Sequence, residues 1–357
     1  MKTEIFDVTK LNGDVLESGE IHAGRGARRD MDEALRSIRI AAKTIRAGGL
    51  VAFPTETVYG LGCDAFNEAA VKKVYAAKGR PSDNPMIVHI ARASDVGALT
   101  PRITPEFVRL ADSFWPGPLT MILKKKECVP DATTGGLDTV AVRLPDHPAA
   151  LELIRASGCP LAAPSANLSG SPSPTKAEHV IRDLSGKADV ILAGSDSRVG
   201  IESAVLDLTS DIPTILRPGV LSADVLSEVL GREVVCDDAL LRDGVSSGAA
   251  PKSPGMKYRH YAPKAEMLIV EGSEDRVRAE INRLKSLNER LGAAVGVMLF
   301  DERAYAEAAR DFYARLRELD DLGVDLILAG ALSDRTGIGF AIMNRMFKSA
   351  GYRVVKV

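Results

Sequence analysis

The stretch SAVLDLTSDIPTILRPG (residues 203–219) holds two apolar segments, SAVLDL and PTILRPG, with no helical segment between them. Both are short apolar runs bounded by turn residues, which is typical of strands. Further strands are predicted at 50–53, 86–90, 119–124, 139–144, 160–163 and 189–194, and helices at 31–47, 67–77, 104–113, 148–157, 175–184 and 222–230. Since many strands follow one another without an intervening helix, we expect an α+β domain with a mixed or largely antiparallel twisted sheet.

A domain boundary is predicted downstream of this region. In DGVSSGAAPKSPGMKYRHYAPK (243–264), Gly, Ser and Pro replace the periodic apolar residues, and a basic, aromatic cluster follows. Beyond it, strands at 267–270, 295–300 and 324–330 alternate with helices at 277–291, 304–319 and 339–349. This βαβαβα order predicts a small parallel sheet with helices on its faces. We therefore expect domains at 1–242 and 265–357, joined by a linker at 243–264.

The composition is that of an ordinary globular protein. The chain has 357 residues, and Lys+Arg 46 against Asp+Glu 48 leave a net charge of −2. Such a balance provides no global positive field for a polyanion, so an anionic substrate must meet a local cluster of cations. The four cysteines are scattered and no C-x-x-C occurs, which makes a zinc site improbable and predicts a reducing, cytoplasmic location. Because the longest apolar stretch is AAVGVMLF (293–300), no membrane span is expected.

Polar residues beside Gly and Pro at strand ends mark candidate binding segments, because strand ends project side chains from rigid supports into clefts. These segments are PTETVYGLG (54–62), KGRPSDNPMIVH (78–89), TVAVRLPDHP (139–148), APSANLSGSPSPT (163–175) and GIESAVLDL with LRPG (200–219). Lys78 and Arg80 stand two residues apart before Pro81, so both charges can converge on one anion such as a triphosphate. A solvated basic helix end explains the same spacing equally well.

The other segments also leave alternatives open. His89 ends an apolar strand, where a structural histidine is more common than a catalytic one. Arg143 also ends a strand and suits a carboxylate, although a structural salt bridge is nearly as plausible. The loop 163–175 leaves hydroxyl and N–H groups free for phosphate or ribose, but its composition alone favours an ordinary flexible loop. The P-loop, nucleophile-elbow and H-E-x-x-H motifs are absent, and Thr336 to Gly339 is better explained as a turn before a helix.

Taken together with WPGPLT (115–120) and PGMKYRHYAPK (254–264), these segments resemble the YrdC-type threonylcarbamoyl-AMP synthases. The similarity is to the longer, two-domain form with a C-terminal Rossmann-like domain, and it runs from about residue 30 to the C-terminus. The resemblance implies that L-threonine, bicarbonate or CO2 and ATP give L-threonylcarbamoyl-AMP and pyrophosphate. A partner transferase complex would then modify adenosine 37 of tRNA, with transient tRNA contact possible.

The resemblance also implies roles for particular residues. Lys78 and Arg80 would stabilise charge on the phosphates, with Mg2+ bound mainly through those phosphates and no dedicated metal site. Threonine would be held by Thr57, His89, Arg143, Ser203 and the backbone around Ala163. ATP would be held by Arg80, Asn84, Thr139, Ser165, Asn167, Ser173 and Arg217, with Tyr261 of the linker closing over the nucleotide.

The chain departs from the family pattern at two places. Ala204 stands where the family usually has Thr, which removes a hydroxyl beside Ser203. About thirty residues precede the similarity, and in them we expect an edge strand in TEIFDVT (3–9) and a mobile basic turn in GRGARRD (24–30).

Two other classes of function remain open at this stage. The chain could be an RNA-binding module without adenylate chemistry, although only 5% of its residues are aromatic. The C-terminal domain could also carry a small-molecule site of its own, which fold alone cannot decide.

Overall fold

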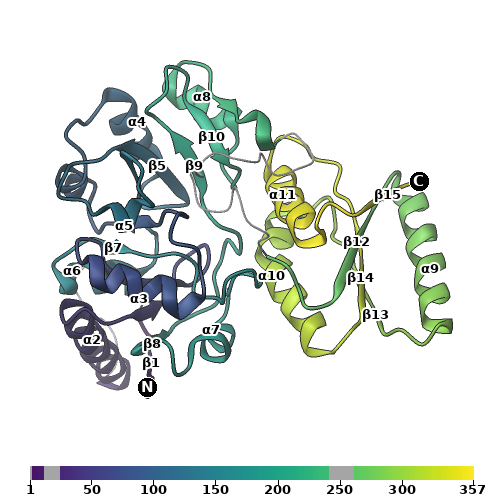
Figure 1. Cartoon of the computed structure of the whole chain (residues 1–357), viewed down its shortest axis with the longest axis horizontal. Coiled ribbons are helices and arrows are strands. Elements are labelled where there is room, and N and C mark those ends of the chain that lie inside the picture. The colour runs from purple at the N-terminus through teal and green to yellow at the C-terminus, as the bar shows by residue number, and fades with distance from the viewer. Residues whose placement is uncertain (1, 12–24, 241–260) are drawn as a thin grey trace.

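The larger sheet joins strands from nearly the whole first part of the chain (Figure 1). The computed structural model describes residues 2–11, 25–240 and 261–357. Within these residues, eleven strands of this sheet lie in the order β1-β8-β2-β3-β7-β4-β6-β5-β9-β10-β11. Their bounds are β1 Glu4–Asp7, β2 Val51–Phe53, β3 Gly60–Asp64, β4 Ile87–His89, β5 Leu119–Lys124, β6 Thr139–Arg143, β7 Leu161–Ala162, β8 Val190–Ala193, β9 Ala204–Asp207, β10 Thr214–Arg217 and β11 Val235–Cys236. The sheet contains both parallel and antiparallel pairs, so the predicted mixed sheet is confirmed.

Helices cover both faces of this sheet. They are α2 Arg25–Arg46, α3 Glu68–Lys78, α4 Pro105–Phe114, α5 Asp131–Thr134, α6 Pro148–Ser157, α7 Ala177–Leu184 and α8 Ala223–Leu230, with short 3-10 helices at Ala93–Ala98 and Asp238–Leu240. Successive side chains of β2 point to opposite faces of the sheet, and each face has its own hydrophobic core. Val51 and Phe53 pack with residues of α2 and α6 on one face, whereas Ala52 packs with residues of α3 and α4 on the other.

Several local predictions need correction. Arg25 to Asp30, expected to form a basic turn, belong to the start of α2. Strand β3 was not predicted, because Gly60 and Gly62 interrupt the apolar pattern there. Gly62 is needed, since a Cβ at that position would lie 2.7 Å from the Phe53 ring. Strand β11 and a C-terminal strand at Val354–Lys356 were also missed. The edge strand expected in residues 3–9 is confirmed as β1, which pairs with β8.

The second sheet is small and entirely parallel, as the βαβαβα order predicts. Its strands lie in the order β13-β14-β12-β15. Their bounds are β12 Glu266–Glu271, β13 Val295–Met298, β14 Leu326–Gly330 and β15 Val354–Lys356, and the helices are α9 Glu274–Arg290, α10 Tyr305–Asp321 and α11 Ile338–Ala350. Helices α10 and α11 face the larger sheet and α9 lies on the far side (Figure 1).

The two parts of the chain pack closely against each other. Val58 and Ile201 of the first part share a hydrophobic cluster with Phe312 and Tyr313 of α10. Gly200 has φ +81° and a Cβ there would lie 2.2 Å from Arg310 Cα, so the backbones nearly touch. Most of the linker expected at 243–264 lies outside the described residues, and the predicted domain boundaries remain predictions.

Candidate active site

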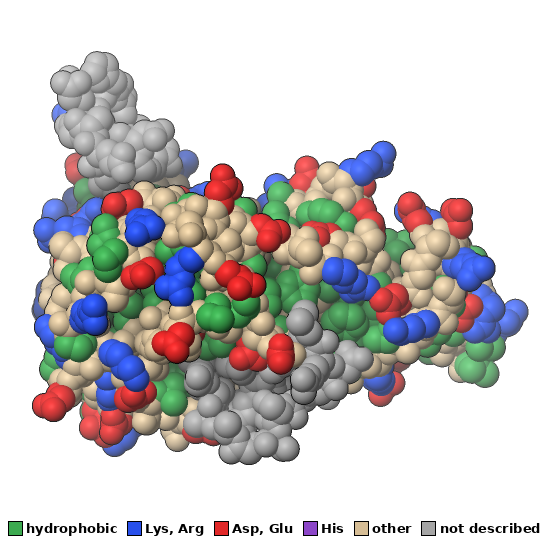
Figure 2. Space-filling view, turned by 90° about the horizontal axis from the view of Figure 1, so that it is seen from above, with side chains coloured by type: hydrophobic (Ala, Val, Ile, Leu, Met, Phe, Trp, Pro, Cys, Tyr) green, Lys and Arg blue, Asp and Glu red, His purple; other side chains and the backbone are tan. Residues whose placement is uncertain are grey.

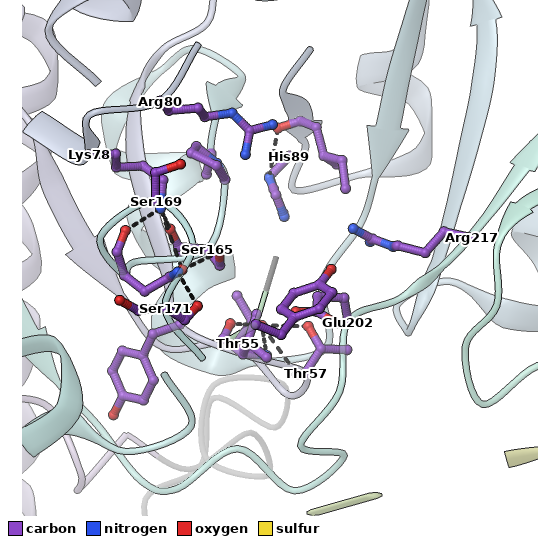
Figure 3. A pocket seen from close by; sticks show the side chains of 18 of the residues that line it. Thr55, Thr57, Lys78, Arg80, His89, Ser165, Ser169, Ser171, Glu202 and Arg217 are labelled. Atoms are coloured by element: carbon purple, nitrogen blue, oxygen red, sulfur yellow. Dashed lines mark hydrogen bonds between the residues drawn. The ribbon is translucent and has the colours of Figure 1, made fainter. Parts of the chain in front are cut away.

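A cleft of about 740 Å³, a volume that includes solvent at its mouth, lies at the ends of strands of the larger sheet (Figure 3). It brings together ten of the predicted residues: Thr57, Lys78, Arg80, His89, Arg143, Ala163, Ser165, Asn167, Arg217 and Tyr261. Figure 3 shows Lys78 and Arg80 on one side, Arg217 on the opposite side, and His89 pointing into the space between them. Segments far apart in the sequence therefore form one site.

The cations at the end of α3 are held by backbone carbonyls. Gly79 adopts a left-handed conformation with φ 62°, which ends the helix and turns the chain toward the cleft. Lys78 is 3% exposed, and its Nζ donates to the carbonyl oxygens of Ser165 and Asn167. The half-buried Arg80 donates through Nη2 to Pro85 O at 2.9 Å. The alternative of a solvated helix end is therefore wrong for Lys78.

Burial also changes the acidity of this pair. Removal from water lowers the pKa of Lys78 well below its ordinary value, and the neighbouring Arg80 lowers it further. Burial lowers the pKa of Arg80 to about 10, which still leaves it protonated at neutral pH. An anion that enters the cleft would raise the pKa of both groups and so favour their charged forms.

His89 and Arg143 lie side by side because β4 and β6 are adjacent parallel strands in which these residues are paired. His89 Nδ1 lies 3.2 Å from Ile87 O, and burial, with Arg143 nearby, lowers the pKa of the imidazole to about 3. The ring is therefore neutral at physiological pH. When Nδ1–H donates to that carbonyl, Nε2 is left as an acceptor.

Arg143 makes the structural salt bridge considered for it, and its role toward a substrate carboxylate remains a prediction. Its Nε donates to Gly117 O at 3.3 Å, and its Nη2 lies 2.6 Å from Glu56 Oε1. Those last two atoms form a close ion pair that lacks hydrogen-bond alignment, and both Glu56 oxygens are buried without a hydrogen-bond partner. Arg143 therefore makes a buried salt bridge and also lines the cleft.

The loop 163–175 is fixed by its own side chains, so the alternative of an ordinary flexible loop does not hold. Asn167 Nδ2 donates to the carbonyl oxygens of Leu168 and Ser171, both at 2.8 Å, and Ser169 N donates to Lys78 O at 2.9 Å. Lys78 and this loop hold each other in place.

Arg217 forms the opposite wall together with Ser203. The antiparallel pairing of β9 and β10 shifts register near Arg217, and its guanidinium donates to Ser203 O at 3.0 Å and to Ser203 Oγ at 3.1 Å. The Ser203 hydroxyl also lies 2.7 Å from Thr120 Oγ1. Ser203 is thus fully buried and supports Arg217 from behind.

Four predicted residues do not line the cleft: Asn84, Thr139, Ser173 and Ser203. Thr139 begins β6, at the other end of the strand from Arg143, about 13 Å away at the usual rise per residue. Asn84 contributes its carbonyl oxygen to Arg80, and Ser173 donates to Glu202. Their predicted roles toward ATP and threonine remain predictions.

Sequence reasoning missed several lining residues, above all Glu202. Glu202 immediately precedes Ser203 within the quoted segment GIESAVLDL, but no pattern around it indicates a buried acid. Thr55 also lines the cleft, where its hydroxyl lies 3.0 Å from that of Thr57.

Among residues 2–11, 25–240 and 261–357, no group of three or more His, Cys, Asp or Glu side chains is placed to hold a metal ion. In the same part of the chain, no helix has the length and apolar character needed to cross a membrane.

Known proteins show similarity over nearly the whole chain. A family model described as "Telomere recombination" matches residues 43–219, and a second, described as "Threonylcarbamoyl-AMP synthase, C-terminal domain", matches residues 221–351. Threonylcarbamoyl-AMP synthase of Pyrococcus abyssi is 50% identical over 330 residues, which cover 90% of this chain and 96% of that protein. The Bacillus subtilis protein of the same name is 48% identical, with 88% of this chain and 93% of that protein covered.

A solved structure agrees with these sequence matches. The crystal structure of P. abyssi Sua5 complexed with L-threonine superposes with a TM-score of 0.86 at 48% identity, and covers 90% of this chain and 96% of that one. The architecture of both sheets is therefore shared with that protein. The chain belongs to the threonylcarbamoyl-AMP synthase family, in the two-domain form that carries the C-terminal domain.

Proposed function

We propose that this protein is an enzyme, an L-threonylcarbamoyl-AMP synthase, which uses L-threonine, bicarbonate or CO2 and ATP and releases pyrophosphate. The observation that carries the proposal is the convergence of Lys78, Arg80 and Arg217 on one cleft that also holds the neutral His89 and Arg143. Family membership and the threonine complex of the P. abyssi protein support the same substrates.

On the threonine side, Arg143 binds the carboxylate and the neutral ring of His89 supplies a hydrogen-bond acceptor. Thr57 and the backbone around Ala163 complete this part of the cleft. A neutral imidazole suits the site, because a second positive charge there would compete with Arg143 for the carboxylate. The threonine amine attacks CO2, loses a proton to solvent or bicarbonate, and becomes a carbamate.

On the ATP side, a carbamate oxygen attacks the α-phosphorus, and the bond from that phosphorus to the β-phosphate oxygen breaks. Both reacting groups are anionic when they meet, so the main requirement is fixed positive charge. Lys78, Arg80 and Arg217 supply it from positions that protein contacts already hold. Preorganised charges need not be rearranged as the reaction proceeds.

Mg2+ enters as the partner of ATP in this proposal and is bound mainly through the phosphates. The cleft wall around Lys78, Ser165 and Asn167 offers amines, hydroxyls and amides, which fit phosphate oxygens better than they fit a resident cation. When bound, the ion would neutralise charge on the phosphates, and these protein residues would orient them.

The product would pass to a tRNA threonylcarbamoyl transferase complex, which modifies adenosine 37, and we place this step in the cytoplasm. An RNA-binding module without adenylate chemistry is the less favoured reading. Acidic and basic side chains are interspersed over the face seen in Figure 2, rather than gathered into a basic platform.

The test is pyrophosphate release by the purified protein with ATP, Mg2+, bicarbonate and threonine. Release that depends on threonine, with threonylcarbamoyl-AMP detected by mass spectrometry, supports the proposal. Threonine-independent release, or retention of tRNA at physiological salt without any turnover, contradicts it.

A further inference from the structure

A buried arginine of the C-terminal domain reaches the wall of the cleft. Arg345 of α11 is 1% exposed, and its Nε donates to Glu202 Oε2 at 2.9 Å. The same guanidinium donates to Glu202 O at 3.2 Å and to Pro218 O at 2.7 Å. Glu202 and Pro218 directly adjoin Ser203 and Arg217, so one side chain holds the ends of β9 and β10 together.

The Glu202 carboxylate is the centre of this contact. It lines the cleft but is only 6% exposed. Oε1 accepts from Ser173 Oγ at 2.6 Å, and both oxygens lie 3.0 Å from Tyr313 OH of α10. The loop 163–175, α10 and α11 thus all donate to one carboxylate, which links the predicted ATP loop to the C-terminal domain.

The charges around Glu202 explain why Arg345 matters. The titratable groups that face this carboxylate are Arg345, Arg217, Lys348, Tyr261 and Tyr313. Burial alone would raise the pKa of Glu202, but Arg345, and then Arg217, hold it below its ordinary value. Without Arg345, the negative charge of an ionised Glu202 would be compensated mainly by Arg217. Arg217 is the cation that lies opposite Lys78 and Arg80 in the cleft.

We propose that Arg345 is a positioning residue of the ATP site: it neutralises Glu202, so that Arg217 remains available to phosphate and Ser173 stays fixed. This inference rests on the proposed function, since it assigns the wall around Arg217 to ATP. The C-terminal domain then completes the nucleotide side of the cleft instead of only covering it.

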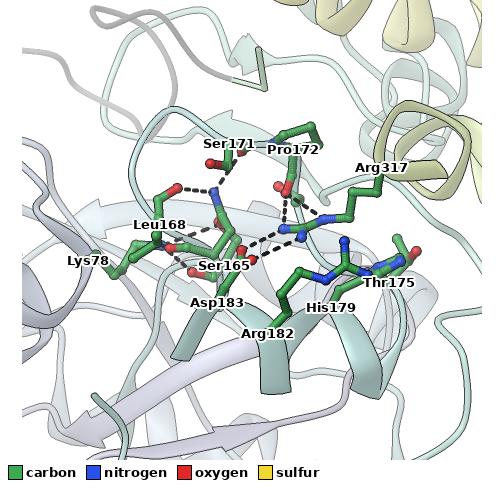
Figure 4. Close-up of polar contacts among 12 residues, drawn as sticks. Lys78, Ser165, Leu168, Ser171, Pro172, Thr175, His179, Arg182, Asp183 and Arg317 are labelled. Atoms are coloured by element: carbon green, nitrogen blue, oxygen red, sulfur yellow. Dashed lines mark hydrogen bonds and ion pairs between the residues drawn. The ribbon is translucent and has the colours of Figure 1, made fainter. Parts of the chain in front are cut away.

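A second buried pair in the same interface provides a matched control. Arg317 of α10, 5% exposed, donates to Asp183 at 2.7 Å and to Pro172 O at 2.6 Å (Figure 4). Asp183 does not line the cleft. Arg317→Gln therefore breaks an interdomain ion pair of similar burial and leaves no unpaired carboxylate in the cleft wall. Because Arg317 also holds Pro172 of the loop 163–175 and Asp183 acts on Lys78, a change of KM alone in this variant is expected, and only the pH dependence of KM serves as the control.

The experiment measures KM for ATP from pH 6 to pH 8.5 in the wild type, Arg345→Gln, Arg317→Gln and the double variant Glu202→Gln with Arg345→Gln. For Arg345→Gln we expect KM to rise at least ~10-fold at pH 8, the scale of a broken buried pair. The defect should shrink as the pH falls, because Glu202 takes up a proton once Arg345 is gone. The double variant should lose this pH dependence, and Arg317→Gln should show none.

The outcomes separate the two proposals. If the wild type releases no pyrophosphate with threonine, the proposed function fails. If the wild type is active and Arg345→Gln keeps its KM and pH profile, only the positioning role fails. Should Arg345→Gln not fold, Tyr313→Phe decides, since it removes one donor from the same carboxylate. An unchanged KM for ATP in Tyr313→Phe would then overturn the inference.

Discussion

Replacing Arg80 by Ala tests the phosphate side of the cleft. The change removes one well-formed hydrogen bond, to Pro85 O at 2.9 Å, and two longer ones to Asn84 O at 3.3 and 3.4 Å. A half-buried side chain with these contacts contributes only about 1 kcal/mol to folding, so the fold should survive. The loss of a preorganised charge at the transition state should instead cut turnover ~100-fold, or about 2.7 kcal/mol.

The assay is pyrophosphate release at saturating ATP and threonine, together with a thermal melt. Arg109→Ala is the control, because Arg109 also donates to a backbone carbonyl, Leu230 O at 3.0 Å, but lies outside the cleft. It should leave turnover unchanged. Arg80→Lys, which keeps the charge but not the planar fork, should fall between the wild type and Arg80→Ala. Wild-type turnover in a folded Arg80→Ala protein would refute the assignment.

Three further predictions concern threonine, acid stability and the metal. His89→Ala should raise KM for threonine and weaken the preference over serine, which a methyl pocket alone limits to ~1 to 3 kcal/mol; an unchanged KM and preference would contradict the placement of His89. Burial lowers the pKa of His147 to about 4, so the unfolded chain binds more protons below pH 6.5 and stability falls with the pH. His147→Asn keeps an N-cap acceptor for α6. Between neutral pH and pH 4, the variant should lose up to about 3 kcal/mol less of its free energy of unfolding than the wild type, as measured by urea unfolding. If the variant loses as much as the wild type, His147 is not a cause of the acid instability. Chelation of Mg2+ should abolish turnover without lowering the melting temperature of the ATP-free protein, and a lower melting temperature would indicate a resident ion.

Most of the fold could be predicted from local patterns, because a strand buried on one or both faces of its sheet has a regular pattern of apolar residues. The parallel C-terminal sheet followed from the alternation of apolar runs with helical spacing. Strand β3 escaped prediction, since Gly60 and Gly62 satisfy a packing requirement set by Phe53 on the neighbouring strand. The start of α2 at Arg25 was missed because its first turns are polar and carry no apolar period.

The sequence by itself determined which chemical groups are available: Lys78 and Arg80 beside a helix-ending glycine, His89 and Arg143 at strand ends, and a loop of Ser and Asn. Local spacing suffices for this, because such groups are placed by the element that carries them. The tertiary structure alone decided their surroundings. The carbonyl oxygens that bury Lys78 come from residues 165 and 167, and Arg345 meets Glu202 across 143 residues of chain. The charge of a buried group depends on partners brought together by the whole fold, and no local pattern records which partners those are.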